Sequence, residues 1–405
     1  MSRLYPFNAL RPDARVASRV ASVPYDVVSA DEARALAEGN PLSFLHVTRS
    51  EIDLPVGTNP YDPGVYAKAL SNFDRLKANA PLVREAEPSL YLYRLRMGSH
   101  EQVGLAGCFS VDDYDRGLIK KHEKTRKDKE DDRTRHITEL RAQTGLVFLT
   151  YRASEAVHGI TPRIMSTSPL YDFVASDGVA HTVWQVTGTE RDGLVSAFAA
   201  LDALYIADGH HRAASASRVS ADLRAAGSSN DESGRFVAVA FPDDQMHILP
   251  YNRVVKDLGG HTPQSFLSAL RALGAVHAGS TSPDRPGEVS VFLDGRWYGL
   301  HLPQPGPGAS HADGLDVEVL QQRVLQPLLK VGDPRTDTRI DFVGGIRGTA
   351  ALEEAVNEGR AAVAFSLYPV TVAELMAIAD ANQIMPPKST WFEPKLRDGL
   401  LTHVI

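Results

Sequence analysis

The stretch LYIADGHHRAASA, residues 204–216, joins a short apolar run to an aspartate, a glycine, two histidines and an arginine. The run LYIA is typical of a buried strand, and the alanine-rich segment 213–227, which contains no proline, predicts a helix. Gly209 lies between the two segments. We therefore expect the polar cluster at the N-terminus of a helix that directly follows a strand.

A helix N-terminus leaves backbone amides unpaired and carries a partial positive charge, so it attracts phosphates. Arg212 would add a bidentate fork, His210 and His211 can donate to phosphate oxygens, and Gly209 lets the backbone approach closely. Asp208 would repel a phosphate unless Mg²⁺ lies between them or the carboxylate acts as a base.

Two other interpretations of this cluster remain open. Asp208 can simply cap the helix, with both histidines bonded to backbone groups. Alternatively, His210 and His211 can bind a transition metal, although neighbouring residues on a strand point to opposite faces and the HExxH pattern is absent.

Composition limits the class of protein. A chain of 405 residues with 43% hydrophobic content can form two lobes. The formal net charge of -7 makes sustained nucleic-acid binding unexpected. The single cysteine, Cys108, excludes an intramolecular disulfide and a cysteine metal cage, and no window approaches the roughly 20 apolar residues that span a membrane. We expect a cytoplasmic protein without membrane or nucleic-acid partners.

Strand and helix patterns are mixed along the chain, which indicates an α/β (mixed α+β) fold. In the first part, strands are expected at 89–97, 102–111, 146–151, 181–186 and 235–242, and helices at 31–38 and 60–80. Further on, strands are expected at 288–295, 296–302 and 361–370, with helices at 317–329 and from Thr371. The glycine-rich stretch DLGGHTPQS, residues 257–265, predicts a break between lobes of residues 1–257 and 258–405.

The motif ADGHHRAASA, residues 207–216, resembles the Asp-Gly-His-His-Arg phosphate motif of the free L-serine kinases, whose fold is shared with ParB partition proteins and sulfiredoxin. Nearly the whole chain resembles the bacterial domain-of-unknown-function family 1015, through stretches that include PYDVVS (24–29), RIDFVGGIRG (339–348) and IMPPKSTWFEPKLRDGL (384–400). The resemblance implies a ParB/serine-kinase-like nucleotide-binding core with a second α/β lobe that contributes to the cleft.

The same resemblance implies a nucleotide-dependent kinase that phosphorylates a small hydroxyl metabolite, with free L-serine as the first choice. The implied cofactors are Mg²⁺ and ATP or ADP, with Asp208 on the metal or the acceptor hydroxyl. A nucleotide-gated switch of the ParB type and a phosphoester hydrolase remain alternatives. Neither G-x-x-x-x-G-K-[ST] nor G-x-S-x-G occurs, so Walker-type binding and α/β-hydrolase chemistry have no support.

The charge-rich run IKKHEKTRKDKEDDRTRH, residues 119–136, is either a solvated helix face or a second phosphate clamp. In the clamp interpretation, Arg133 and His136 share a helix face, or Arg133 and Arg135 share a strand face. Glu123 lies among lysines and would stay ionised, as a base or a Mg²⁺ ligand.

Two further regions supply candidate residues. Asp26 follows Pro24 in a bend that can expose its carboxylate, so the catalytic base remains open among Asp26, Glu51, Glu123 and Asp208. The rigid loop MPPKSTWFEPKL, residues 385–396, offers charge, hydroxyls and a stacking surface to a substrate. In a separate stretch, the glycine pair 344–345 precedes Arg347, which could reach a phosphate or carboxylate. The candidate substrate-binding residues are Lys388, Ser389, Thr390, Trp391 and Arg347. The sequence does not fix the oligomeric state.

Overall fold

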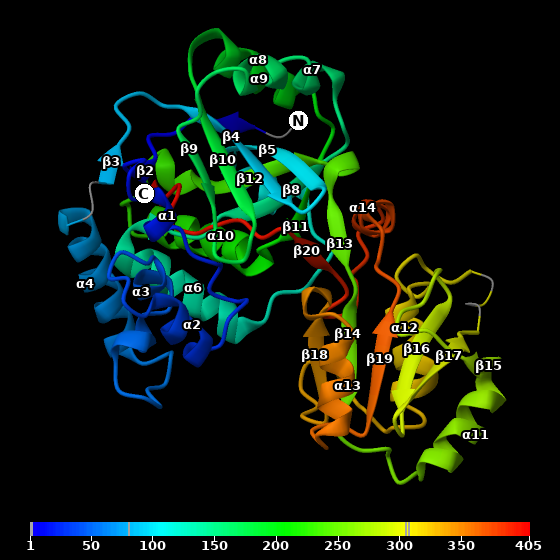
Figure 1. Ribbon diagram of the computed structural model, residues 1–405. Helices are drawn as coiled ribbons and strands as arrows, with labels where there is room; N and C mark the ends of the chain where they lie inside the picture. The colour runs from blue at the N-terminus through cyan, green and yellow to red at the C-terminus, as the bar shows by residue number, and fades with distance from the viewer. Residues whose placement is uncertain (1–2, 80–81, 304–305, 307) are drawn as a thin grey trace. The chain divides into compact units, whose positions relative to one another are not determined.

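A computed structural model describes residues 3–79, 82–303, 306 and 308–405, and its contacts divide the chain into two compact units (Figure 1). The first unit comprises Met1–Lys121, Thr125–Met246 and Pro394–Ile405, and the second comprises His122–Lys124 and His247–Glu393. This division differs from the predicted break at residue 257. The strand β14 (Tyr251–Val255) pairs within the second unit, whereas the C-terminal segment returns to the first.

The first unit is built on a nine-stranded mixed sheet in the order β6-β11-β8-β12-β5-β4-β10-β9, with β1 paired to β5. The β11–β6 and β12–β8 pairs are parallel and the other pairs are antiparallel. The strands are β1 Leu4–Tyr5, β4 Leu90–Met97, β5 His100–Ser110, β6 Ile119–Lys120, β8 Val147–Tyr151, β9 Tyr171–Val174, β10 Ala180–Val186, β11 Leu204–Asp208 and β12 Arg235–Pro242. The strands predicted at 89–97 and 102–111 are confirmed as β4 and β5, which form an antiparallel hairpin with Met97 opposite His100.

Helices and short strand pairs surround this sheet. The helices are α1 Ala17–Val20, α2 Ala30–Ala37, α3 Leu45–Thr48, α4 Pro63–Asn79, α5 Val111–Asp115, α6 Lys127–Leu140, α7 Glu155–His158, α8 Thr161–Met165, α9 Gly188–Ala199 and α10 His210–Ala225. The short pairs are β2 (Leu10–Pro12) with β3 (Leu82–Arg84), and β7 (Ala142–Gln143) with β21 (His403–Val404). The β7–β21 pair ties the C-terminus to the first unit.

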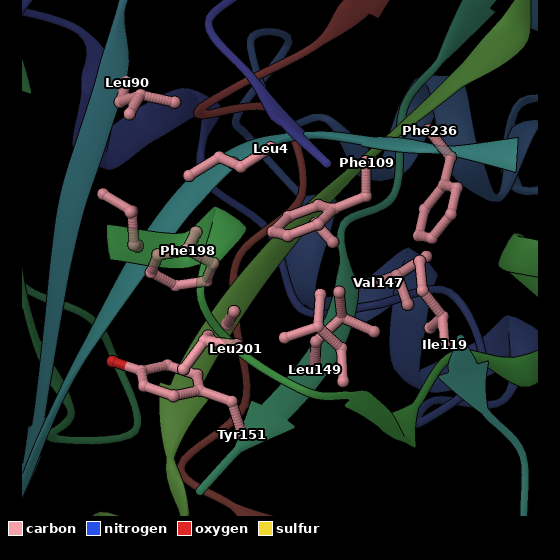
Figure 2. Packing of buried hydrophobic residues seen from close by; sticks show 14 of the residues in the cluster. Leu4, Leu90, Phe109, Ile119, Val147, Leu149, Tyr151, Phe198, Leu201 and Phe236 are labelled. Carbon is pink, nitrogen blue, oxygen red and sulfur yellow. The ribbon is translucent and has the colours of Figure 1, made fainter. Parts of the chain in front are cut away.

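One large apolar core holds the strands that carry the candidate site. Figure 2 shows side chains of the sheet, among them Val147, Leu149 and Phe109, packed with Phe198 of α9. These side chains are buried, and each large apolar side chain contributes about 1.5–3 kcal/mol relative to exposure. The core therefore fixes the ends of β8 and β11, from which the site residues project.

The second unit contains a six-stranded antiparallel sheet in the order β15-β17-β16-β19-β14-β18 and a separate pair of β13 with β20. The other strands are β13 His247–Leu249, β15 Val276–Ala278, β16 Glu288–Leu293, β17 Arg296–His301, β18 Ile340–Gly344, β19 Val363–Leu367 and β20 Trp391–Glu393. The helices are α11 Pro263–Leu273, α12 Asp316–Leu320, α13 Ala350–Asn357 and α14 Val372–Asp380.

The helix predicted at 317–329 is shorter than expected. The α-helix α12 ends at Leu320 and continues as a π-helical turn, Gln321–Leu325, in which the amide of Gln326 donates to the carbonyl of Gln321. Pro327 follows, and its missing N–H and its ring prevent a regular helix from continuing. Within the described ranges, no helix of either unit has the length and apolar character needed to cross a membrane.

Candidate functional site at the start of helix α10

The motif at 208–212 forms a strand–glycine–helix junction, as the sequence predicts. The strand β11 ends at Asp208, and α10 begins at His210. Gly209 has φ +91°, a left-handed conformation that glycine adopts without strain. A Cβ at this position would lie 3.4 Å from the Arg212 guanidinium and 3.4 Å from the Val147 backbone. The glycine therefore serves both the turn and the close packing beneath it.

Asp208 is an ionised carboxylate held by cations. Its Oδ2 lies 2.9 Å from Nζ of Lys395, which is only 12% exposed in its side chain. Burial opposes ionisation, but Lys395, Arg212 and the amide of Gly209 together hold the pKa of Asp208 far below its usual range. Lys395 belongs to the C-terminal segment and was not singled out from the sequence.

Arg212 is buried and joins three parts of the first unit. Its Nη1 donates to the carbonyl of Leu146, and its Nη2 lies 3.1 Å from Oδ2 of Asp26. Burial opposes its charge, but Asp26 and Asp208 raise the pKa of Arg212. The guanidinium that is predicted to form a bidentate fork is therefore largely engaged by protein groups. Within the described residues, only Nε of Arg212 has no hydrogen-bond partner.

The two histidines of the motif occupy different environments. His210, the first residue of α10, is 5% exposed. His211 is partly exposed, and its Nε2 accepts a hydrogen bond from the backbone amide of Arg126 at 2.9 Å. That bond places the proton of a neutral ring on Nδ1 of His211. The two side chains therefore do not form an equivalent pair of phosphate donors.

Asp398 lies buried in a small cavity beside this junction. The cavity measures about 20 Å³, enough for about one water molecule. Asp398 is 1% exposed, and neither carboxylate oxygen meets hydrogen-bond geometry with another described residue, although the amide of Leu146 faces it. Burial raises the pKa of Asp398 to about 7, Arg212 opposes this rise, and the negative charge of Asp26 adds to it. The lining residues include Tyr25, Arg133, His136, Gly145, Arg212 and Asp398.

Helix α6 contributes the second set of predicted phosphate-binding residues. Arg133 and His136 share a face and both line the Asp398 cavity, whereas Arg135 lies over the ring of Tyr66 at 4.4 Å. Arg133 is held by Asp132 at 2.7 Å, and its guanidinium lies 4.0 Å from the centre of the Tyr25 ring. The helix-face alternative of the sequence prediction therefore describes α6.

His136 is neutral in this arrangement. Its Nε2 donates to the carbonyl of Val47 at 3.0 Å, and it is 3% exposed. Burial, followed by the charge of Arg133, lowers the pKa of His136 to about 4, while the Val47 carbonyl opposes the shift. This buried ring supplies positioning within the first unit rather than positive charge.

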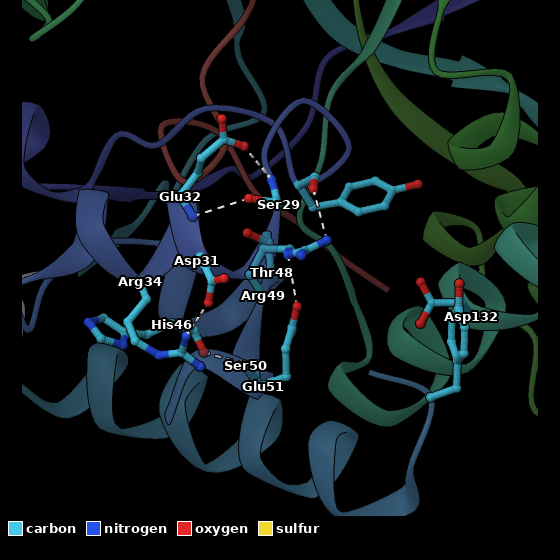
Figure 3. A network of polar contacts seen from close by, with 12 residues as sticks. Ser29, Asp31, Glu32, Arg34, His46, Thr48, Arg49, Ser50, Glu51 and Asp132 are labelled. Atoms are coloured by element: carbon cyan, nitrogen blue, oxygen red, sulfur yellow. Dashed lines mark hydrogen bonds and ion pairs between the residues drawn. The ribbon is translucent and has the colours of Figure 1, made fainter. Parts of the chain in front are cut away.

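Glu51, one of the four candidate bases, is tied into a separate polar network, shown in Figure 3. It is 7% exposed and forms an ion pair with Arg49 at 2.9 Å, while Arg49 also donates to the backbone carbonyl of Tyr25. In the same network, Ser29 and Glu32 form the capping box that starts α2, the helix predicted at 31–38. The charge of Glu51 is therefore compensated by the guanidinium of Arg49.

The remaining predicted residues belong to the second unit. Glu123 lies in the segment His122–Lys124, where the amide of Met385 donates to the carbonyl of His122. Arg347 lies exposed in a short 3₁₀ turn. The Ser389 hydroxyl donates to the carbonyl of Pro386 at 2.7 Å, and the Trp391 indole donates to Glu393 at 2.7 Å. Lys388, Ser389 and Thr390 thus belong to a loop of the second unit, and Trp391 is the first residue of β20.

The glycine pair before Arg347 has a packing role. A Cβ at Gly344 would lie 2.6 Å from the ring of Trp391, and a Cβ at Gly345 would lie 2.6 Å from the carbonyl of Pro250. The indole of Trp391 also packs edge-on against Tyr251, at 5.2 Å between ring centres. Trp391 is therefore an anchor within the second unit, which is the structural alternative to a ligand-stacking role.

Arg253 is a buried cation of the second unit that the sequence did not indicate. It is 3% exposed, and its guanidinium donates to the carbonyls of Tyr251 and Lys388, the latter at 2.9 Å. Burial lowers the pKa of Arg253 to about 9. Its hydrogen bonds fasten the loop that contains Lys388 and Ser389 to the sheet.

The fold and the site define a mixed α/β protein in which buried and partly buried charged side chains lie around a strand–glycine–helix junction. The chain belongs to the family described as "Protein of unknown function (DUF1015)", whose model matches residues 4–324.

Comparison with solved structures gives distant similarities. A conserved hypothetical protein from Pyrococcus furiosus has 15% identity and a TM-score of 0.36, covering 73% of this chain and 94% of that one. A free serine kinase in complex with AMP has 14% identity and a TM-score of 0.37, covering 73% and 91%. SbnI with C-terminal truncation from Staphylococcus aureus has 12% identity and a TM-score of 0.37, covering 72% and 85%. No curated protein matches the sequence.

Proposed function

We propose that this protein is a nucleotide-dependent kinase that transfers a phosphoryl group to a small hydroxyl-bearing metabolite. The start of α10 would hold the donor phosphates, and free L-serine is the acceptor that the motif resemblance implies. The observation that supports this most is the cluster of charges at the junction beside Gly209. It combines the buried Arg212 with the partly buried Asp208 and Lys395 and the more exposed Asp26. Groups with strongly shifted pKa values, as Asp208 and Arg212 have here, concentrate at functional sites.

The first turn of α10 and Lys395 would bind the phosphates. Amides at the start of a 16-residue helix and the ammonium of Lys395 offer positive potential, while Arg212 holds the carboxylates in place. Phosphoryl transfer depends chiefly on such positioning and charge stabilisation. Lys395 would exchange part of its contact with Asp208 for a phosphate oxygen.

Asp26 is the base that we favour among the four candidates. All three first-unit carboxylates have a cationic partner, and Asp26, paired with Arg212, is the most exposed. Its side chain is 35% exposed, against 28% for Asp208 and 8% for Glu51. In the proposed step, Asp26 accepts the hydroxyl proton, the acceptor oxygen bonds to the terminal phosphorus of the nucleotide, and the bond from that phosphorus to its bridging oxygen breaks to release the shortened nucleotide.

The contacts of Asp208 do not fit direct Mg²⁺ ligation. The carboxylate is already compensated by Lys395 at 2.9 Å and by the nearby charge of Arg212, and both cations would repel a divalent ion. We therefore assign no step to a metal at Asp208. Mg²⁺ carried by the nucleotide would supply charge neutralisation at the phosphates.

The test is a turnover assay followed by ³¹P NMR, with purified protein, Mg²⁺, L-serine, and either ATP or ADP. The kinase proposal predicts phosphoserine and the shortened nucleotide in equal amounts. Asp26→Asn should lower the rate at least about a hundredfold, because the proton acceptor is lost. Asp31→Asn, which alters a carboxylate that is 90% exposed, is the matched control.

Other outcomes of the same assay would replace the proposal. Free phosphate released without need of serine would indicate a phosphoester hydrolase. Tight nucleotide binding without turnover for any hydroxyl acceptor would indicate a nucleotide-gated switch. Full phosphoserine production by Asp26→Asn would remove Asp26 from the mechanism.

A further inference from the structure

Three neighbouring strands of the second unit place two histidines and a glutamate on one face of the sheet. His277 of β15 lies opposite Gly299 of β17, and Glu288 of β16 lies opposite His301 of β17. Directly opposite residues share a face, as do residues two apart on one strand. His277, Glu288 and His301 therefore project to the same side, around Gly299.

The three side chains approach one another closely. One potential ligand atom from each residue lies within 4.8 Å of the other two, and Nε2 of His277 is 3.1 Å from Oε1 of Glu288. The rings of His277 and His301 are 5.1 Å apart between centres. Ligand atoms around a tetrahedral zinc ion are about 3.4 Å apart, given zinc–ligand distances of about 2.0–2.1 Å. Small side-chain rotations would bring all three residues into that range.

Gly299 leaves the space that this cluster occupies. A Cβ at residue 299 would lie 2.2 Å from Cε1 of His277 and 2.8 Å from Oε1 of Glu288. Any other residue there would push the imidazole away from the carboxylate. The sheet thus contains a cradle between β15 and β16 that only glycine keeps open.

The hydrogen bonds of His277 orient a lone pair toward the glutamate. Its Nδ1 is 2.9 Å from the carbonyl oxygen of Ala278, and a carbonyl only accepts, so Nδ1 carries a proton. In a neutral ring, Nε2 then presents its lone pair to an oxygen of Glu288 at 3.1 Å. Two lone pairs at that distance repel unless a proton or a cation lies between them. A backbone carbonyl bound to the other ring nitrogen is also the usual support of a metal-bound histidine.

We propose that His277, Glu288 and His301 bind a divalent transition-metal ion, with Zn²⁺ as the first choice. Two imidazoles and one carboxylate suit zinc, whereas Mg²⁺ and Ca²⁺ prefer oxygen ligands alone. The side chain of His277 is 45% exposed, so water can occupy a fourth position. Arg285 lies 3.7 Å from the other glutamate oxygen, Oε2, and leaves Oε1 to the metal. This site does not depend on the proposed kinase function.

The test is zinc binding by the full-length protein after metal removal with a chelator, measured by titration calorimetry against a competing chelator of known affinity. The wild type should bind one equivalent of Zn²⁺ tightly. His301→Ala and Gly299→Ala should each lower the affinity for this Zn²⁺ ion more than about tenfold. His311→Ala alters an exposed histidine outside the cluster and should leave the zinc affinity unchanged. Circular dichroism checks that each variant folds.

A second measurement separates a metal site from a simple ion pair. Co²⁺ in place of Zn²⁺ should give the intense visible absorption of a tetrahedral site, and this absorption should be lost in Glu288→Gln. Equal zinc affinity in wild type and His301→Ala would overturn the proposal. The proposal would also be overturned by histidine ¹⁵N spectra in which both ring nitrogens of His277 stay protonated after one equivalent of Zn²⁺ is added. A ring protonated on both nitrogens has no lone pair to offer a metal.

Discussion

Replacing Asp398 by asparagine should remove a pH-dependent cost to the stability of the first unit. Burial raises the pKa of this carboxyl from 3.8 to about 7. As the pH rises from about 4, the unfolded chain loses the proton first, so the folded state loses stability until the pH passes about 7. A difference of about 3 pH units, at 1.36 kcal/mol per unit, corresponds to about 4 kcal/mol. Asparagine has no such proton to lose.

The assay follows unfolding of the first unit alone. The chain has three tryptophans, of which Trp184 belongs to the first unit and Trp297 and Trp391 to the second. In a Trp297→Phe, Trp391→Phe background, urea unfolding followed by Trp184 fluorescence gives the free energy of unfolding of that unit.

Between pH 5 and pH 8, the wild type should lose roughly 3 kcal/mol relative to Asp398→Asn. The exposed Asp31→Asn serves as the control at both pH values. A difference between wild type and Asp398→Asn that stays the same at both pH values would refute the reasoning. It would mean that the Asp398 carboxyl of the folded chain is already ionised across the whole range.

Three further predictions rest on single contacts. Arg212→Met should destabilise the first unit by about 3–5 kcal/mol in the same urea assay, because the carbonyl of Leu146 and the carboxylate of Asp26 lose their donor. A loss below about 1 kcal/mol would contradict the importance of this network. Gly344→Ala should destabilise the second unit by about 1–3 kcal/mol, because the new methyl group meets the indole of Trp391. Trp391 fluorescence in a Trp184→Phe, Trp297→Phe background measures this, and unchanged stability would argue against the packing. The imidazole C2 proton of His136, assigned with His136→Gln, should keep one chemical shift between pH 5.5 and 8, because its pKa is about 4; a midpoint near 6.5 would show an exposed ring.

Local features of the fold could be predicted from the sequence because short-range chemistry determines them. The alanine-rich segment after Gly209 forms α10, Ser29 and Glu32 cap α2, and the hairpin of β4 and β5 follows its alternating pattern. The pairing of Arg133 and His136 on one face follows from helical periodicity. These outcomes depend on residues within a few positions of one another.

The partners of the junction could not be predicted, because they come from distant parts of the chain. Lys395 reaches Asp208, and Asp398 lies in a cavity that Arg212 also lines, only because the C-terminal segment returns to the first unit. No local pattern marks that return. The hydrogen bonds from Arg212 to Asp26 and to the carbonyl of Leu146 could not be predicted for the same reason, because both acceptors are remote in sequence.

The most direct test of the central claim is an NMR titration of the start of α10 with nucleotide. Protein labelled with ¹⁵N-histidine, with signals assigned through His210→Gln and His211→Gln, reports the backbone amides of the first two residues of α10. We predict that ATP or ADP with Mg²⁺ shifts both amide signals in a saturable way, and that Lys395→Met weakens this binding. Unchanged amide signals at millimolar nucleotide, in a protein that still turns the nucleotide over, would place the phosphate site elsewhere and contradict the account.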